Sequence, residues 1–228
     1  MGSKRISTIL FDLDNTITFT RKADNKTCIE VEHWLESHGV SSIVTKDLTA
    51  QFMKKFRASV APDYKTDEAG LDQWRKNIWA EVLPQKFSGL LDDLYTLWKK
   101  TRLQQLAAET YIDLLGQLGN SYSLALITNG PSIAQWEKIH ATGVKKYFDL
   151  IIVSGDLEVQ KPSKLIFELA FSKLQVKRTR IIVTEDRTYI LGFHSTIAQP
   201  VKTNVGITLF FHSYIIIQTT CIEYIIND

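Results

Sequence analysis

The stretch that decides the fold is Ile6-Ser-Thr-Ile-Leu-Phe11, followed at once by Asp12-Leu-Asp-Asn-Thr16. The run Ile6–Phe11 is short and largely apolar and contains β-branched residues, which favours a buried strand. Two acids, Asp12 and Asp14, follow at its carboxyl end. Because the carboxyl ends of parallel strands open onto one crevice where ligands bind, we expect these carboxylates to line a site.

Strand-like and helix-like segments alternate after residue 107. The apolar runs are 123–127, 150–153 and 181–183, and the segments with helical periodicity are 107–118, 131–141 and 163–174. Such alternation is typical of a parallel sheet joined by right-handed crossovers. The sequence therefore predicts an α/β protein with a Rossmann-like parallel sheet core, and Val205–Phe211 is predicted to add a strand to it.

The first strand is separated from the others by a long block with helical periodicity between residues 28 and 118. This block is far longer than a crossover between two parallel strands requires, so we interpret it as an insertion. The predicted division is a core of residues 1–20 and 105–228 and an inserted helical cap of residues 21–104. Large aromatic side chains dominate burial, so four tryptophans are expected to form the core of the cap: Trp34, Trp74, Trp79 and Trp98.

Composition excludes several classes of protein. The 228 residues include 27 Lys and Arg against 25 Asp and Glu, and this near-neutral balance gives no electrostatic case for binding nucleic acid. Cys28 and Cys221 lie far apart and form no metal-binding or disulfide framework, which favours a reducing compartment. Residues 1–7 lead into too few apolar residues for a signal peptide. We expect a cytoplasmic monomer or weak dimer without a nucleic-acid or membrane partner.

Four polar segments each follow a predicted strand and so are expected to converge. They are Asp12–Thr16, Thr128-Asn129-Gly130, Lys161-Pro162 and Glu185-Asp186. A carboxylate can attack phosphorus, and the resulting intermediate needs an acid for the leaving oxygen and a base for water. Asp12 as nucleophile and Asp14 as acid/base fit these roles.

Phosphoryl transfer also needs positive charge around the phosphate oxygens. Lys161 and a Mg²⁺ ion held by carboxylates would supply it, and Thr128 with nearby backbone N–H groups would hold the remaining oxygens. Taken alone, Lys161 would usually be a solvated surface lysine, and Thr128-Asn129-Gly130 would more often be an ordinary turn between a strand and a helix. Their places after successive strands favour the catalytic interpretation.

The segments Phe11–Thr16, Leu126–Gly130 and Lys161-Pro162 resemble the first three motifs of the haloacid dehalogenase-like hydrolases, and the helical block resembles the cap of that superfamily. Asp14 favours its phosphatases over its dehalogenases. The resemblance implies that Asp12 is nucleophile and metal ligand, and that Asp14 is acid/base with its backbone carbonyl on the metal. It further implies that Thr128 and Asn129 hold phosphate and that Lys161 neutralises charge.

Substrate class is indicated by one helix. Leu97-Trp-Lys-Lys-Thr-Arg-Leu-Gln104 resembles the subfamily that acts on the 9-phosphate of an N-acylneuraminate, which implies a phosphorylated sugar. Arg102 in this segment is well shaped to reach a substrate carboxylate, although arginines on helix surfaces are usually solvated.

The fourth motif departs from the family, in which a second metal-binding acid follows the first by five residues. Glu185 and Asp186 are the candidate metal ligands here, but Ile190 and Leu191 occupy the positions five residues later. The best alignment puts Tyr189 in place of the missing acid, and a phenol is a poor Mg²⁺ ligand. The alternative prediction is therefore an impaired relative that binds phosphate ligands without turnover.

The resemblance ends at about residue 186, where the composition also changes. Residues 188–228 contain only three charged side chains, Lys202, Glu223 and Asp228, together with nine isoleucines. We interpret this segment as a divergent C-terminus.

Overall fold

A computed structural model of the chain describes residues 6–59, 67–108 and 110–175, and beyond these the strands at 180–185, 199–204, 210–211, 214–215 and 220–225. Contacts divide the chain into two compact units. The sheet unit comprises residues 1–18, 110–130 and 143–228, and the helical unit comprises residues 19–109 and 131–142. The predicted core and cap boundaries stay a prediction, and residues 131–142, assigned to the core by the sequence, group here with the helices.

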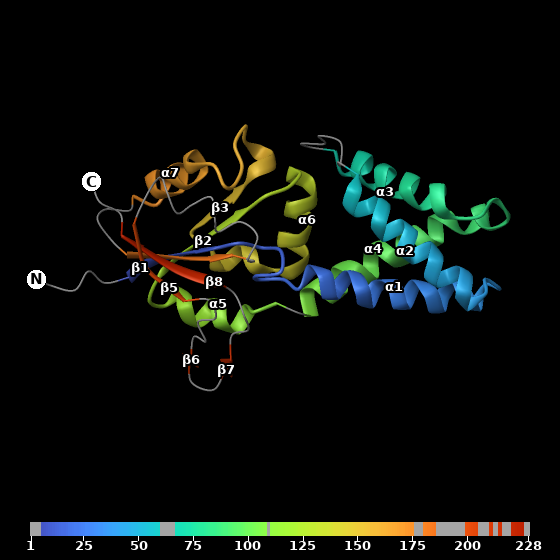
Figure 1. Ribbon diagram of the computed structural model, residues 1–228, viewed down its shortest axis with the longest axis horizontal. Coiled ribbons are helices and arrows are strands. Elements are labelled where there is room, and N and C mark those ends of the chain that lie inside the picture. The colour runs from blue at the N-terminus through green and yellow to red at the C-terminus, as the bar shows by residue number, and fades with distance from the viewer. Residues whose placement is uncertain are drawn as a thin grey trace, which may run out of the picture. The chain divides into compact units, whose positions relative to one another are not determined.

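The sheet unit contains a six-stranded sheet in the order β3-β2-β1-β4-β8-β5 (Figure 1). Its four parallel strands are β1 (Ile6–Phe11), β2 (Ser123–Thr128), β3 (Leu150–Val153) and β4 (Arg180–Glu185). Strand β8 (Thr220–Ile225) runs antiparallel to β4, and β5 (Gln199–Asn204) runs antiparallel to β8. The predicted α/β fold with a parallel sheet core is confirmed.

The divergent C-terminus contributes the strands at one edge of this sheet. The prediction that Val205–Phe211 adds a strand to this sheet is wrong for Phe210–Phe211, the part that the structure describes. These two residues form β6, which pairs with β7 (Tyr214–Ile215) in a separate two-stranded sheet. Residues 205–209 lie outside the described residues. The tail is rich in β-prone residues throughout, so its local pattern could not select which segments pair.

Helices cover both faces of the sheet. Leu10, Ala125, Ile127 and Ile152 pack against α7 (Lys164–Lys173), and Figure 1 shows α5 (Ile112–Gly119) on the opposite face. Ser163 caps α7 by accepting a hydrogen bond from the backbone N–H of Leu165 at 3.4 Å. Two short 3₁₀ helices, η2 (Val144–Tyr147) and η3 (Ser154–Asp156), flank β3.

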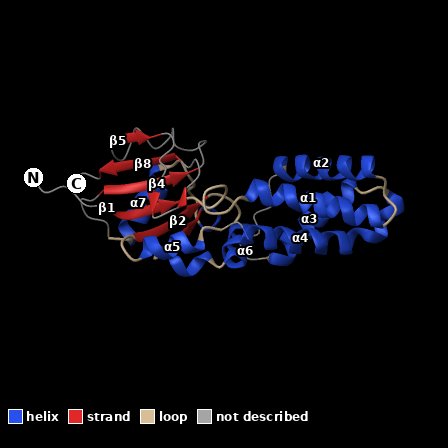
Figure 2. Cartoon of the chain, turned by 90° about the horizontal axis from the view of Figure 1, so that it is seen from below, coloured by secondary structure: helices blue, strands red, loops and turns tan. Residues whose placement is uncertain are grey.

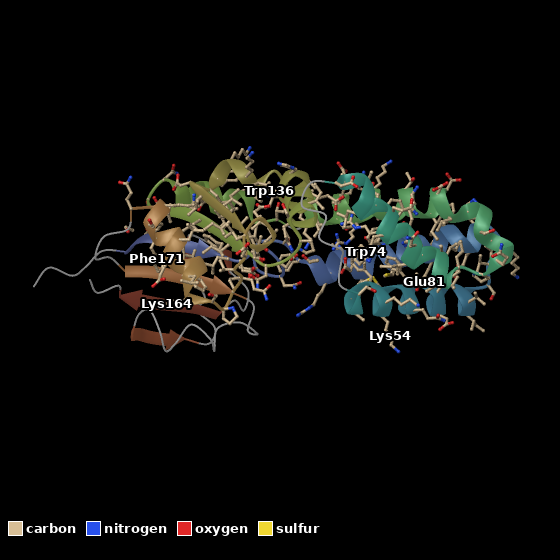
Figure 3. The ribbon with its side chains drawn as sticks, turned by 90° about the horizontal axis from the view of Figure 1, so that it is seen from above. Lys54, Trp74, Glu81, Trp136, Lys164 and Phe171 are labelled. Atoms are coloured by element: carbon tan, nitrogen blue, oxygen red, sulfur yellow. The ribbon has the colours of Figure 1, made fainter. Side chains whose placement is uncertain are left out.

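The helical unit is built around aromatic side chains (Figures 2 and 3). Its helices are α1 (Thr20–Ser37), α2 (Ser42–Ala58), α3 (Glu68–Val82), η1 (Gln85–Leu90), α4 (Leu91–Ala108) and α6 (Ser132–Thr142). Phe52 stacks on Trp79 with 3.8 Å between ring centroids and meets Trp98 edge-on. Trp34 and Trp74 pack against this cluster, which confirms the predicted tryptophan core, whereas Lys54 points away from it (Figure 3).

Among the helices that the structure describes, none combines the length and the apolar character needed to cross a membrane.

Candidate active site

A tight loop follows β1 and carries both acids of the first motif. The carbonyl of Leu13 accepts hydrogen bonds from the backbone N–H groups of Ile17 and Thr18, both at 3.0 Å. The loop requires a positive φ of 60° at Asn15, a conformation that asparagine tolerates better than most residues. Asp12 is consequently buried while Asp14 is half-buried.

Lys161 reaches the Asp12 carboxylate from the loop that precedes α7. Its Nζ lies 2.9 Å from Oδ1 of Asp12, and its side chain is only 2% exposed. Burial raises the pKa of Asp12 above its ordinary value, and the charge and hydrogen bond of Lys161 offset part of that rise. Lys161 is therefore not a solvated surface lysine.

Asn129 fixes the backbone that carries this lysine. Its Nδ2 donates to the carbonyl of Lys161, and its Oδ1 accepts from the backbone N–H of Lys161, both at 2.9 Å. The preceding residue, Thr128, ends β2 and is almost wholly buried. The second and third motifs are thus joined directly, and the predicted phosphate contacts of Thr128 and Asn129 stay predictions.

Ser154 is a site residue that the sequence reasoning missed. Its Oγ accepts a hydrogen bond of 3.1 Å from the backbone N–H of Gly130, so it holds the loop after β2. Ser154 directly follows β3, as Asp12 follows β1 and Asn129 follows β2. That shared position after a parallel strand is the signal that could have identified it.

The fourth motif lies beside the first in the sheet. Thr184 of β4 is the register partner of Phe11 of β1, so the backbone of Glu185 ends its strand at the same edge as Asp12. The side chain of Glu185 and the whole of Asp186 and Tyr189 lie outside the described residues. The metal role of Glu185 and Asp186 therefore stays a prediction.

The sequence profile of the haloacid dehalogenase-like hydrolases matches residues 6–189. This chain belongs to the haloacid dehalogenase-like hydrolases. The match ends close to residue 186, where the sequence places the start of the divergent tail.

Two relatives are similar to this hydrolase over most of its length. It is 30% identical to human N-acylneuraminate-9-phosphatase over 82% of this chain and 76% of that protein. It is also 30% identical to the HAD-hydrolase YfnB of Bacillus subtilis over 75% of this chain and 71% of that protein. The family match and the phosphatases among its relatives confirm the prediction of a phosphatase-type enzyme.

A solved structure shows the same fold. A candidate beta-phosphoglucomutase from Thermotoga maritima superposes with a TM-score of 0.52 at 20% identity, covering 82% of this chain and 80% of that chain. The likeness supports the fold of the hydrolase and says nothing of its substrate.

The donors at this site fit a Mg²⁺ ion. Mg²⁺ prefers carboxylate and other hard oxygen ligands, and the loop after β1 presents Asp12 and Asp14 within three residues of each other. The register of β4 brings the Glu185 backbone to the same edge. Within the described residues no group of three or more His, Cys, Asp or Glu is arranged to hold a metal.

Arg102 of the helical unit is not solvated, contrary to the usual behaviour of helix-surface arginines. It is 4% exposed, and its Nε donates to Oδ1 of Asp24 at 2.7 Å. Its guanidinium also lies over the rings of Phe56 and Trp98. The ion pair with Asp24 and the packing against aromatic rings explain why Arg102 is buried inside the helical unit.

A groove of about 620 Å³ in the helical unit contains none of the predicted site residues. It lies along α3 and α4 and is lined by three lysines, Lys76, Lys99 and Lys100. Lys76 pairs with Asp92, and Lys99 pairs with Glu68 and Asp72. Because two of its three lysines already pair with carboxylates and none of the predicted site residues lines it, we assign the groove no role.

Proposed function

We propose that this hydrolase is a Mg²⁺-dependent phosphatase that cleaves phosphomonoesters of small metabolites through an aspartyl phosphate on Asp12. The observation that carries the proposal is the buried contact of 2.9 Å between Asp12 and Lys161. A nucleophilic carboxylate beside a fixed cation suits attack on a phosphoryl group, whose negative charge the cation stabilises.

The two acids divide the proton transfers. A carboxylate oxygen of Asp12 attacks phosphorus, the ester P–O bond breaks, and Asp14 gives its proton to the departing alcohol oxygen. Asp14 then removes a proton from water, which attacks the phosphorus of the aspartyl phosphate. The P–O bond to Asp12 breaks, inorganic phosphate leaves, and Asp12 and Asp14 return to their starting states.

The remaining residues hold and neutralise the phosphoryl oxygens. Lys161 supplies positive charge, and phosphoryl oxygens are held by Thr128 at the end of β2 and by the backbone N–H of Asn129, whose side chain is bonded to Lys161. Asp12, Asp14, Glu185 and Asp186 are the proposed Mg²⁺ ligands, and bound Mg²⁺ adds positive charge at the phosphoryl group. The B. subtilis relative YfnB is known in a magnesium-bound structure, which supports this choice of metal.

The proposed substrate class is a phosphorylated sugar, with the 9-phosphate of an N-acylneuraminate as the first candidate. The human relative of that name and the segment Leu97–Gln104 support it. The test is a screen of sugar phosphates, including this one, with Mg²⁺ at neutral pH. Hydrolysis of at least one sugar phosphate is expected, and hydrolysis of none would contradict the proposal.

An impaired relative is the second candidate, motivated by Tyr189 at the position of the missing acid. Calorimetric titration with Mg²⁺, then with orthovanadate as a phosphate mimic, compares the natural chain with Tyr189→Asp. If the variant binds Mg²⁺ at least tenfold more tightly and gains turnover, the impaired relative is correct. If the natural chain binds Mg²⁺ as tightly as the variant, that candidate loses its basis.

The environment of this enzyme is proposed to be the cytoplasm, because its two cysteines form no disulfide framework in the sequence. We further propose that it acts as a monomer or weak dimer, with a small phosphorylated metabolite as its partner. Sedimentation across a range of protein concentrations tests the oligomeric state, and a stable dimer at nanomolar concentration would contradict it.

A further inference from the structure

Helix α6 belongs to the sheet unit by sequence order but to the helical unit by packing. It connects β2 to β3 along the chain, yet its contacts place it with α3 and α4. The chain therefore passes from one unit to the other at Gly130–Pro131 and back at Thr142–Gly143. Both junctions contain a glycine with positive φ, 132° at Gly130 and 67° at Gly143, which are conformations that other residues rarely adopt.

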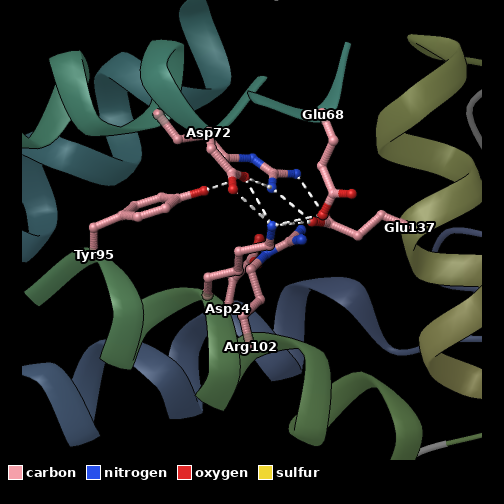
Figure 4. Close-up of polar contacts among 8 residues, drawn as sticks. Asp24, Glu68, Asp72, Tyr95, Arg102 and Glu137 are labelled. Carbon is pink, nitrogen blue, oxygen red and sulfur yellow. Dashed lines mark hydrogen bonds and ion pairs between the residues drawn. The ribbon is translucent and has the colours of Figure 1, made fainter. Parts of the chain in front are cut away.

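Glu137 attaches α6 to the other helices of this unit (Figure 4). Its two carboxylate oxygens accept hydrogen bonds from Nη1 and Nη2 of Arg75 on α3, at 3.0 and 2.8 Å. Nζ of Lys99 on α4 lies 3.4 Å from Oε1 of the same carboxylate. The Glu137 side chain is 10% exposed and that of Arg75 only 3%, so this is a buried, bidentate pair rather than a surface contact.

The cations around Glu137 are themselves fixed. Lys99 also contacts Glu68 and Asp72, and Tyr95 donates a hydrogen bond to Asp72. The Arg75 guanidinium lies 5.7 Å from the ring centroid of Trp98, inside the aromatic core. Burial acts to raise the pKa of Glu137, but the hydrogen bonds and charge of Arg75, with the charge of Lys99, lower it. The carboxylate is thus ionised at neutral pH and firmly held.

The other end of α6 is tied to the proposed phosphate loop. Only Gly130 and Pro131 separate Asn129 from Ser132, the first residue of the helix. The carbonyl of Pro131 accepts a hydrogen bond of 3.1 Å from the backbone N–H of Gln135, so the loop continues directly into the first helical turn. A displacement of α6 therefore acts on the segment that carries Thr128 and Asn129.

We propose that Glu137 is a positioning residue that holds α6 in place and, through α6, the phosphate loop at 128–130. The Arg75–Glu137–Lys99 contacts hold α6 against α3 and α4. Because the loop continues directly into the first turn of α6, loosening the helix loosens the loop. This inference rests on the proposed function for its catalytic consequence, but the attachment of α6 is a property of the chain by itself.

The test compares Glu137→Gln with Glu81→Gln in the full-length protein. Both substitutions preserve size and remove a charge from an ion pair of the helical unit, but Glu81 pairs with Lys55 at the surface. Hydrogen–deuterium exchange is measured over residues 128–142, without ligand and with orthovanadate. Glu137→Gln is expected to speed exchange there at least tenfold and to weaken orthovanadate binding at least tenfold, while Glu81→Gln changes neither.

Exchange in Glu137→Gln equal to that in the natural chain would overturn the proposal. So would equal acceleration in all helices, because that result marks a purely structural role. Arg75→Lys keeps the charge but loses the bidentate geometry, and it must show the same localised change in a folded protein. If no phosphomonoester is hydrolysed, the proposed function fails, while the exchange result still decides whether Glu137 holds α6.

In an active enzyme, the kinetic constants separate positioning from folding. Glu137→Gln is expected to lower kcat about tenfold or more, with the folded fraction unchanged by circular dichroism. The double variant Arg75→Lys/Glu137→Gln should lose no more than the worse single variant, because both changes break one contact. If the loss of kcat in the double variant equals the product of the two single losses, Arg75 and Glu137 do not act through one contact and the assignment is overturned.

Discussion

Nζ of Lys161 lies 2.9 Å from Oδ1 of Asp12, although 149 positions separate these residues in the chain. The contact joins the first motif, after β1, to the third, before α7. Asn129 of the second motif holds the backbone of Lys161 by two hydrogen bonds. Three segments distant in sequence thus meet at the carboxyl edge of the sheet, as the crevice of a parallel α/β fold requires.

Removing the cation should impair turnover and change its pH dependence. In Lys161→Met we expect kcat to fall by about 10²-fold or more, the cost typical of losing one group that stabilises transition-state charge. Asp12 reacts as the carboxylate, and its pKa is raised above 3.8 by burial although Lys161 opposes the rise. The acid limb of kcat/KM should therefore move to higher pH in the variant.

The control is Lys164→Met, which removes a lysine half-exposed on α7 that pairs with Glu168. Its pH profile and kcat should match those of the natural chain. An acid limb that stays in place in Lys161→Met would show that Lys161 does not act on Asp12.

Ser154 should stabilise the loop after β2. Ser154→Ala removes the acceptor of the Gly130 N–H, and losing this part-buried hydrogen bond should cost about 0.5–1.5 kcal/mol in the free energy of unfolding. Urea denaturation measures this loss, with the exposed Ser121→Ala as the matched control. Equal stability of the two variants would remove Ser154 from the site.

Much of the fold could be predicted because it is encoded in local patterns. The strand Ile6–Phe11 and the strands at 123–128, 150–153 and 180–185 are short apolar runs, and helical periodicity marks the segments between them. The convergence of Asp12, Asn129 and Lys161 followed from one rule on parallel sheets. Each of these predictions rests only on local sequence patterns and on the general topology of parallel α/β sheets.

Other features depend on contacts between distant residues and could not be predicted. Arg75 and Glu137 are 62 positions apart, and nothing local in either segment specifies the other. Likewise, Gly130 and Ser154 meet only because β2 and β3 pair. The tail offered many β-prone windows, so its local sequence did not distinguish Thr220–Ile225, which pairs with β4, from Val205–Phe211.

The aromatic core of the helical unit should dominate its stability. Phe52 is fully buried between Trp79 and Trp98, so Phe52→Ala is expected to lower the free energy of unfolding by about 3–5 kcal/mol. Ile43→Ala, at a side chain 83% exposed, should change it by less than about 0.5 kcal/mol. Guanidinium denaturation followed by tryptophan fluorescence measures both. Similar losses would contradict the packing described.

Acid should weaken the contribution of Glu137 to stability. Its pKa is lowered in the folded protein, so its stabilising effect is complete above the ordinary value of 4.5 and disappears as pH falls through the lower folded value. The difference in unfolding free energy between the natural chain and Glu137→Gln should thus be largest near neutral pH and shrink below about pH 4. Urea denaturation at several pH values tests this, and a difference that grows in acid would contradict the sign.

The most direct measurement of the central claim is the turnover of Asp12→Asn on whichever phosphomonoester the natural chain hydrolyses with Mg²⁺. Asparagine keeps the size of the side chain but cannot act as the nucleophile, so kcat should fall by about a thousandfold or more. Asp113→Asn, at an exposed aspartate on α5, serves as the control and should retain full activity. Turnover in Asp12→Asn that stays within tenfold of the control would contradict the assignment of Asp12 as the nucleophile.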